Sequence, residues 1–169
     1  MNKKTRNNLV VLGVDPGTAI TGYGIIQEEG TRFHALDYGC IRPPTSKMLS
    51  DRYWIIFSGL SDLIEKYTPD MVVVETQYVH KNVASAMKLG MARGGVIIAA
   101  KKHGLPVMEY SPTKAKLSVT GNGRASKGQV QAMIKKLLHL SKIPPSDAAD
   151  ALALALCQFH NKQTKGCEI

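Results

Sequence analysis

Two short apolar runs, each closed by an acid, constrain the fold of this chain more than any other feature. LVVLGV at residues 9–14 is followed by Asp15, and MVVV at residues 71–74 is followed by Glu75. A continuous apolar run of this length is typical of a central strand buried on both faces of a sheet. The sequence therefore predicts two core strands that each end in a carboxylate. Taken singly, Asp15 also fits a turn acid before the following Pro-Gly pair, and Glu75 a strand-end acid that reaches solvent.

Two further acids open an apolar helix near the C-terminus. The segment PPSDAADALALAL places Asp147 and Asp150 three residues apart, and residues 148–156 contain neither glycine nor proline. Residues three apart share one helix face, and we expect Ser146 to be the N-cap. First-turn acids also occur simply as helix starters. A helix this apolar must be buried, however, so both carboxylates are expected near the core.

Together these four acids predict a metal site assembled from distant segments. Carboxylates that gather at neutral pH repel one another and need a cation to compensate them. Oxygen ligands without cysteine or histidine are typical of Mg²⁺ or Mn²⁺, which bind through a few carboxylates and the phosphates of a substrate. The pattern does not fit a zinc site.

The remaining elements predict an α/β fold with a mixed five-stranded sheet. Three leading strands joined by short turns indicate an antiparallel meander, after which helices and strands alternate, so helices are expected on both faces. We expect strands at residues 9–14, 21–27, 33–41, 71–75 and 105–109. We expect helices at residues 46–67, 82–103, 113–119 and 127–140, and a last one from residue 146.

Two glycines fall on one side of the second predicted helix. Gly90 and Gly94 are one turn apart, and glycine lets another backbone approach closely. The pair predicts a close contact, either in the core or at a dimer interface.

Length indicates one domain of ordinary size. The chain has 169 residues, which is enough for a sizeable hydrophobic core. We assign residues 1–8 to a short basic tail, residues 9–160 to a single domain and residues 161–169 to a C-terminal tail. Neither a signal peptide nor a membrane span is expected.

Cysteine usage predicts a reducing compartment. Three cysteines leave an odd thiol and show no paired spacing, which favours the cytoplasm over a disulfide framework. They are Cys40, Cys157 and Cys167.

The positive charge lies almost entirely in one middle segment. Residues 81–136 contain eleven Lys and Arg against Glu109 alone, a net charge of +10, whereas the whole chain carries +9. The rest of the chain is therefore close to neutral. Such asymmetry favours a polyanion partner over a merely solvated surface. An acidic metal site beside a basic region is what phosphodiester chemistry requires, because lysines hold the backbone while cations neutralise the reacting phosphate.

Four segments together resemble one known family. They are LGVDPGTAITGYGII, VVVETQYVHKNVASAMKLGMARGG, VTGNGRASKGQVQ and SDAADALALAL. This combination is similar to the RuvC family of bacterial Holliday-junction resolvases, within the RNase H-like superfamily of nucleases. The resemblance covers nearly the whole chain after the basic tail and makes residues 9–160 a single RNase H-like nuclease domain.

The resemblance implies an activity and its participants. The four acids Asp15, Glu75, Asp147 and Asp150 would be the catalytic, metal-binding residues, with two Mg²⁺ ions per site or Mn²⁺ in their place. The enzyme would hydrolyse phosphodiester bonds of four-way junctions by paired symmetric nicks, leaving 5′-phosphate and 3′-hydroxyl ends. Because one active site only nicks, a two-fold homodimer is expected. A branch-migration helicase complex of the RuvA and RuvB type is implied as a further partner.

Residues that contact DNA are also implied. Lys116 and Lys127 match positions near the scissile phosphate, Arg124 lies in the glycine-rich loop nearby, and Tyr78 matches an aromatic that stacks on a base. The helix that faces the DNA would begin with Lys81, Asn82, Ser85 and Lys88.

Two other functions stay open at this point. DPGTAITGYG also resembles the phosphate-binding turn of actin-like and sugar-kinase ATPases, although those proteins carry two such domains and this chain is too short for that. The other alternative is a basic DNA-binding module without catalysis, which would have no reason to hold four acids together at an electrostatic cost. The TGNGRASKG loop does not match the P-loop pattern; we interpret it as a mobile DNA-contacting loop, with an ordinary connection as the alternative.

Overall fold

The computed structural model describes residues 8–76, 82–161 and 167–169 and contains one mixed sheet. Its strand order is β3-β2-β1-β4-β5-β6. The first three strands are antiparallel neighbours, β1, β4 and β5 run parallel, and β6 pairs antiparallel with β5. The strands are β1 Val10–Asp15, β2 Thr21–Glu29, β3 Arg32–Ile41, β4 Met71–Glu75, β5 Val107–Tyr110 and β6 Cys167–Glu168.

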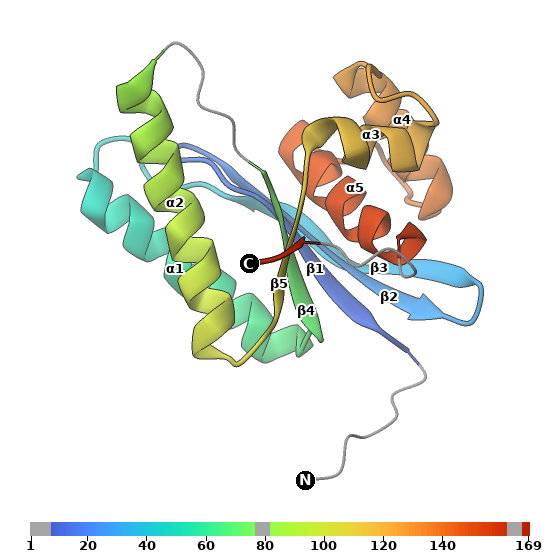
Figure 1. Cartoon of the computed structure of the whole chain (residues 1–169), viewed down its shortest axis with the longest axis horizontal. Helices are drawn as coiled ribbons and strands as arrows, with labels where there is room; N and C mark the ends of the chain where they lie inside the picture. Colours follow the sequence, from blue (N-terminus) through green and yellow to red (C-terminus); the bar gives the residue numbers. More distant parts are fainter. Residues whose placement is uncertain (1–7, 77–81, 162–166) are drawn as a thin grey trace, which may run out of the picture.

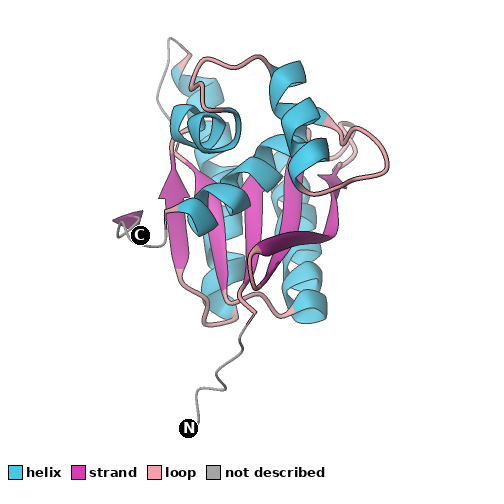
Figure 2. Cartoon of the chain, turned by 90° about the vertical axis from the view of Figure 1, so that its right-hand side faces the viewer, coloured by secondary structure: helices cyan, strands magenta, loops and turns pink. Residues whose placement is uncertain are grey.

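Helices cover both faces of this sheet, as the sequence predicted (Figure 1). Two of them pack on one face, and the other three form a layer over the opposite face, which is turned toward the viewer in Figure 2. The first pair is α1 Leu49–Tyr67 and α2 Val83–Lys102. The second layer is α3 Pro112–Thr120, α4 Lys127–Leu137 and α5 Ser146–His160.

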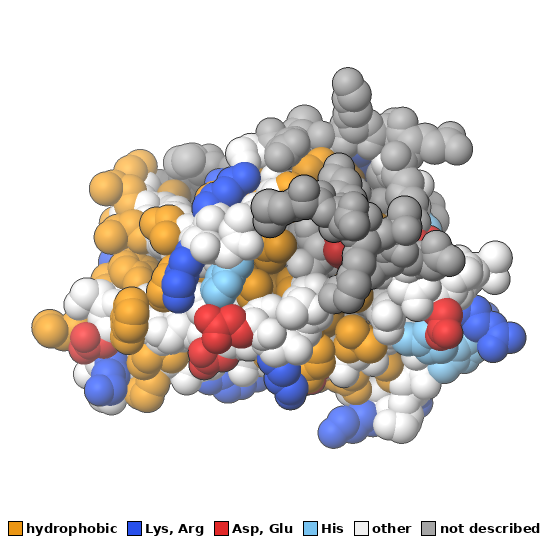
Figure 3. Space-filling model, turned by 90° about the horizontal axis from the view of Figure 1, so that it is seen from below, with side chains coloured by type: hydrophobic (Ala, Val, Ile, Leu, Met, Phe, Trp, Pro, Cys, Tyr) orange, Lys and Arg blue, Asp and Glu red, His pale blue; other side chains and the backbone are white. Residues whose placement is uncertain are grey.

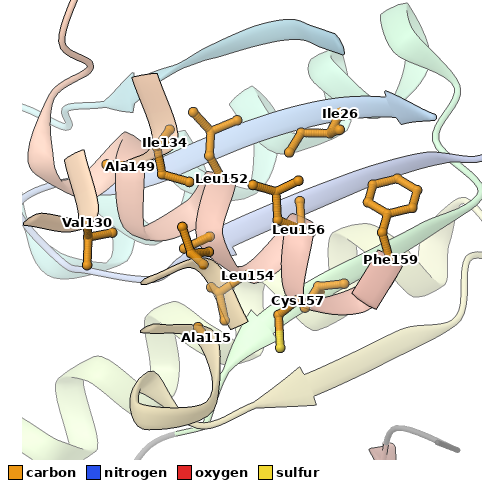
Figure 4. Close-up of a cluster of buried hydrophobic side chains, with 14 of the residues drawn as sticks. Ile26, Ala115, Val130, Ile134, Ala149, Leu152, Leu154, Leu156, Cys157 and Phe159 are labelled. Carbon is orange, nitrogen blue, oxygen red and sulfur yellow. The ribbon is translucent and has the colours of Figure 1, made fainter. Parts of the chain in front are cut away.

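The two faces of the sheet carry separate hydrophobic clusters. In β1 and β4, odd-numbered residues such as Val11 and Val73 pack with α3, α4 and α5, whereas even-numbered residues such as Leu12 and Val72 pack with α1 and α2. Side chains alternate between faces along a strand, so each core strand serves both clusters. In Figure 4, the leucines of α5 lie against β1 and β2, with Ile26 beside Leu152 and Leu156.

Helix ends differ from the predictions where local backbone geometry decides them. α1 begins at Leu49 instead of Ser46 because residues 44–47 form a turn closed by a hydrogen bond from the Lys47 amide to the Pro44 carbonyl. α4 ends at Leu137 instead of Leu140, two residues before His139 adopts a left-handed φ of 50°. That conformation cannot continue a right-handed helix.

The prediction that Ser146 caps the last helix was wrong. Ser146 is already the first residue of α5, Pro145 occupies the cap position, and no side chain caps the helix. The Ser146 hydroxyl is instead buried with no hydrogen-bond partner among the described residues. A proline at the cap has no side-chain oxygen to offer to the amides of the first turn of α5.

The C-terminal segment adds a short strand that the sequence did not predict. The main chain of Cys167 and Glu168 pairs with Glu109 and Met108 of β5, which extends the five predicted strands by a sixth at the edge. Two residues carry too little periodicity to be recognised as a strand. Cys40 and Cys157 are free thiols, as expected.

One helix is unusually apolar on its outside. By length and composition α2 could cross a membrane, yet only about a fifth of its most apolar window is buried, 22%. No other helix in the described part of the chain meets that test. An exposed apolar helix face of this kind is typical of an interaction surface.

Candidate active site

The first two acids lie side by side at the ends of neighbouring parallel strands. Val14 of β1 pairs with Val74 of β4, so Asp15 and Glu75 are the next residue of each strand. Both are odd-numbered and continue the row of Val11, which packs under α5. Strand alternation therefore directs both carboxylates to the face that α5 covers.

Close packing of α5 on the sheet brings the other two acids to the same place. A Cβ atom built on Gly13 would lie 2.0 Å from the Ala151 carbonyl oxygen, and one on Gly22 would lie 2.1 Å from the Asp147 carbonyl oxygen. Only glycine permits so near an approach of helix and strand backbones. The first turns of α5, with Asp147 and Asp150, are thereby held directly over β1 and β2.

A cavity of about 250 Å³ forms where these segments meet. Acids from three separate elements line it, together with lysines from α3 and α4. The charged lining residues are Asp15, Glu75, Asp150, Lys116 and Lys127. Asp147 does not line this cavity, but its charge is near enough to raise the pKa of Asp15. The structure thus gathers all four predicted acids at one site, with Asp147 at its margin.

Burial makes these carboxylates hard to ionise. Loss of hydration raises the pKa of Asp15 to about 8, and the charges of Glu75, Asp150 and Asp147 add to the effect. The pKa of Glu75 is raised to about 7, again by burial first and by Asp150 second. Burial also raises the pKa of Asp150, against the opposing charges of Lys127 and Lys116. Perturbed acids in a cleft mark a functional site more often than a structural one.

This donor set suits a hard divalent cation. The lining carboxylates supply oxygen ligands only, and burial first and mutual repulsion second raise the pKa values of Asp15 and Glu75 in spite of the two lysines. A divalent cation would relieve that repulsion and favour the ionised forms. Within the described residues, no three acidic, histidine or cysteine side chains already form a complete ligand group.

The two lysines come from helices whose starts are well defined by capping residues. Lys116 lies in α3, whose first turn is capped by Ser111 and begins with Pro112. Lys127 is the first residue of α4, which opens with a capping box between Ser126 and Gln129. Both lysines lower the pKa of the neighbouring acids, so both lie within electrostatic reach of the site.

The glycine-rich loop between α3 and α4 is closed by internal hydrogen bonds. The Arg124 amide donates to the Asn122 side chain, and the Thr120 hydroxyl bonds to the carbonyls of Lys116 and Asn122. The Arg124 side chain is exposed. Mobility and DNA contact of this loop stay predictions.

The start of α2 presents three of the predicted DNA-binding residues to solvent. Asn82 is the N-cap and its side-chain oxygen accepts from the Ser85 amide at 3.0 Å. Asn82, Ser85 and Lys88 are all exposed. Tyr78 and Lys81, the other two residues predicted for this surface, lie outside the described residues.

Two arginines hold the main chain around the site, and the sequence reading missed both. Arg52 of α1 donates through Nη2 to the Thr18 carbonyl, in the turn that follows Asp15. Arg93 of α2 donates through Nε to the Glu75 carbonyl and pairs with Glu109. The charge count assigned Arg93 to a polyanion surface. The signal that could have identified its role was Glu109, the one acid in that basic segment.

Comparison with known proteins gives consistent matches. The sequence model of the family described as "Crossover junction endodeoxyribonuclease RuvC" matches residues 11–158. The crossover junction endodeoxyribonuclease RuvC of Protochlamydia amoebophila is 61% identical over 152 residues, which cover 89% of this chain and 90% of that protein. The counterpart in Shewanella amazonensis is 50% identical and covers 92% of this chain and 89% of that protein.

Solved structures agree with this match. Thermus thermophilus RuvC superposes with a TM-score of 0.85 at 31% identity, covering 95% of this chain and all of that one, 100%. The same protein in complex with a Holliday junction substrate gives a TM-score of 0.88 at 30% identity, with coverages of 95% and 99%. The predicted RNase H-like fold is thereby confirmed. The chain belongs to the RuvC family of crossover junction endodeoxyribonucleases.

Proposed function

We propose that this chain is a structure-selective endodeoxyribonuclease that resolves four-way DNA junctions in homologous recombination and DNA repair. The observation that carries the proposal is the cavity in which acids from β1, β4 and α5 meet lysines from α3 and α4. Its Thermus relative at 30% identity was solved with a Holliday junction substrate. The combination of an acidic centre and basic flanks separates this function from that of a DNA-binding module, which needs only the basic residues.

The residues of the site divide into two roles. Asp15, Glu75, Asp147 and Asp150 would hold two Mg²⁺ ions, with Mn²⁺ as the alternative. Divalent ions bound there would supply an activated water and charge stabilisation for in-line attack on the phosphate. Lys116 and Lys127 would hold the scissile phosphate against the acids. The expected products carry 5′-phosphate and 3′-hydroxyl ends.

We propose a DNA-binding surface that extends from the cavity in two directions. On the α3–α4 side it includes Arg124 beside Lys116 and Lys127. On the other side it follows the start of α2, where exposure of the side chains supports contact with a phosphate backbone. The proposed contacts there are Tyr78, Lys81, Asn82, Ser85 and Lys88.

We infer that the protein is a homodimer and that the outer face of α1 and α2 forms the interface. Trp54 is 65% exposed, Met91 59% and Ile98 62%. These three side chains line an apolar groove of about 580 Å³ between the two helices. Figure 3 shows hydrophobic side chains gathered on the left of the molecule, the side on which α1 and α2 lie in Figure 1.

We propose that a second copy of this chain covers the apolar groove, because the symmetry of the DNA substrate favours a dimer. A four-way junction is cut symmetrically, and a two-fold dimer presents two equivalent sites to it. Among the described residues, a Cβ placed on Gly90 or Gly94 would meet no atom within 4 Å, which leaves this side of α2 open to a partner. Both lie on the helix whose apolar side is exposed, where they would let a partner helix approach closely.

The remaining expectations are proposed on family membership. We propose that residues 9–160 form the nuclease domain between a basic tail at 1–8 and a C-terminal tail at 161–169. A branch-migration helicase complex of the RuvA and RuvB type is proposed as a partner in the cytoplasm. No membrane partner is proposed, because the proposed dimer interface would cover the apolar side of α2.

Substitution of single acids tests the assignment of the site. Asp15→Asn and Asp147→Asn should abolish cleavage and preserve junction binding, because the acids supply chemistry and the lysines supply affinity. Asp62→Asn, an exposed acid of α1, is the matched control and should cut normally. Binding is measured by gel shift in chelator and cutting with Mg²⁺. Normal cutting by either site variant would remove that residue from the site.

A further inference from the structure

Arg93 joins three parts of the molecule that meet behind the active site. Its Nε–H donates to the main-chain carbonyl of Glu75 at 3.3 Å, and its Nη2 pairs with Oε2 of Glu109 at 2.5 Å. The two paired side chains are 21% and 22% exposed. The guanidinium thus links α2 to the end of β4 and to β5. Figure 1 shows these three elements as ribbons.

The contact falls where the β4 strand stops. Glu75 is the last residue of β4 and pairs with Tyr110, and the Thr76 amide donates to the Tyr110 carbonyl at 2.9 Å. The strand itself ends at Glu75. Arg93 supplies a bond to the Glu75 carbonyl from the helix side, so the backbone that carries this carboxylate is fixed from two directions.

Arg93 also lies at the boundary between two halves of α2. The buried residues of this helix are Ala92, Val96, Ala99 and Ala100. The half before Ala92 is mostly exposed and begins with the DNA-facing residues proposed above. Arg93 is therefore placed at the point where the projecting half of α2 joins the half that packs on the sheet.

We propose that Arg93 is a positioning residue that sets Glu75 for cation binding and ties it to the DNA-facing start of α2. The proposal rests on the proposed metal-dependent nuclease function. Glu109 aligns the guanidinium, and the bond to the Glu75 carbonyl orients the main chain behind the carboxylate. Outer partners that orient a metal ligand typically change metal affinity or activity by about 10–100-fold when they are removed.

Direct cation binding tests this role without the reaction. Mn²⁺ binding to the full-length protein without DNA is measured by electron paramagnetic resonance for the wild type, Arg93→Gln and Lys101→Gln. The control removes one positive charge from the same helix at an exposed position. We expect about tenfold weaker binding in Arg93→Gln, wild-type binding in Lys101→Gln, and wild-type junction affinity in chelator for Arg93→Gln. Wild-type Mn²⁺ affinity in Arg93→Gln would overturn the proposal, even if its unfolding temperature fell.

Two further variants separate positioning from charge. Arg93→Lys keeps the charge beside Glu109 but cannot reach both partners with one planar group, so it should bind Mn²⁺ as weakly as Arg93→Gln. The double variant Arg93→Gln with Glu109→Gln leaves no unpaired acid and should show the same defect. Recovery of Mn²⁺ affinity in either variant would mean that charge balance alone is at work and would overturn the proposal. A wild type that binds no Mn²⁺ would instead refute the proposed metal-dependent function.

Discussion

At the scale of single residues, the acids of the site make the metal-free protein sensitive to pH. Asp15 has a pKa of about 8 in the folded chain, against an ordinary value of 3.8. Between these two values the folded state holds a proton that the unfolded state has released. The free energy of unfolding therefore falls as pH rises through this window, and the full loss is reached above pH 8.

We predict that the unfolding temperature in chelator falls as pH is raised from about 5.5 to about 8.5. Asp15→Asn should flatten this dependence and be more stable than the wild type at the upper end, because the amide carries no charge to bury. Added Mg²⁺ should stabilise the wild type there and leave the variant nearly unchanged. Thermal scans followed by circular dichroism measure this. Parallel pH profiles for the two proteins would contradict the assigned burial of the Asp15 charge.

The lysines of the site should be visible in the salt dependence of binding. Lys116 lines the cavity beside Glu75 and Asp150. If it contacts a phosphate, Lys116→Ala should weaken junction binding and reduce the slope of log affinity against log salt by about one unit. Binding isotherms in chelator at several salt concentrations give this slope. An unchanged slope would argue against a phosphate contact.

At the scale of elements, two glycines let α5 press its acids onto the sheet. An added methyl at Gly22 would lie 2.1 Å from the Asp147 carbonyl oxygen and 2.4 Å from the carbonyl carbon. Both neighbours are backbone atoms of a helix, so neither can rotate away. The first turn of α5 would have to shift as a unit.

Gly22→Ala is therefore predicted to destabilise the fold by about 1–3 kcal/mol and to lower the cleavage rate further than its stability loss explains. Gly128→Ala is the stability control, because a Cβ at Gly128 of α4 meets nothing within 4 Å. Denaturant unfolding and single-turnover cleavage well below the unfolding temperature give the two quantities. A Gly22→Ala protein with normal stability and normal cutting would show that α5 does not depend on this close approach.

The elements that the sequence predicted best are those with long, uniform patterns. We could predict β1 and β4 from their valine runs, and α5 from its leucine-alanine run, without knowing the tertiary structure. The four acids were then identified because they stand at the ends of these strands and at the start of this helix. The prediction that Ser146 is the N-cap was wrong because both Pro145 and Ser146 fit the start of a helix, and only the backbone conformation shows which of them is the cap. The contacts of Arg93 with Glu75 and Glu109 could not be predicted, because they depend on how α2 packs against β4 and β5, and no local sequence pattern encodes that packing.

At the scale of the whole molecule, the exposed face of α1 and α2 determines whether one active site or two meet the substrate. Ile98 lies on this face and is 62% exposed. In a two-fold interface any substitution is present twice, once on each subunit. A charge introduced there would therefore face its own copy or a desolvated apolar surface.

We predict that Ile98→Glu is a monomer of 18.4 kDa, whereas the wild type and Ile143→Glu are dimers of twice that mass. Ile143 is similarly exposed, 58%, but lies between α4 and α5 on the other side of the sheet. Light scattering coupled to size exclusion measures the mass. The monomer should nick single strands without paired products. Dimers of Ile98→Glu would place the interface elsewhere.

Cleavage of a labelled synthetic four-way junction, beside linear duplex of the same sequence, tests the central claim most directly. Each substrate is incubated with Mg²⁺ and with chelator, and both strands of each polarity are resolved. We predict paired symmetric nicks in the junction alone, only with the metal. Junction binding without cutting in the presence of either Mg²⁺ or Mn²⁺, or equal cutting of linear duplex, would contradict a metal-dependent junction resolvase.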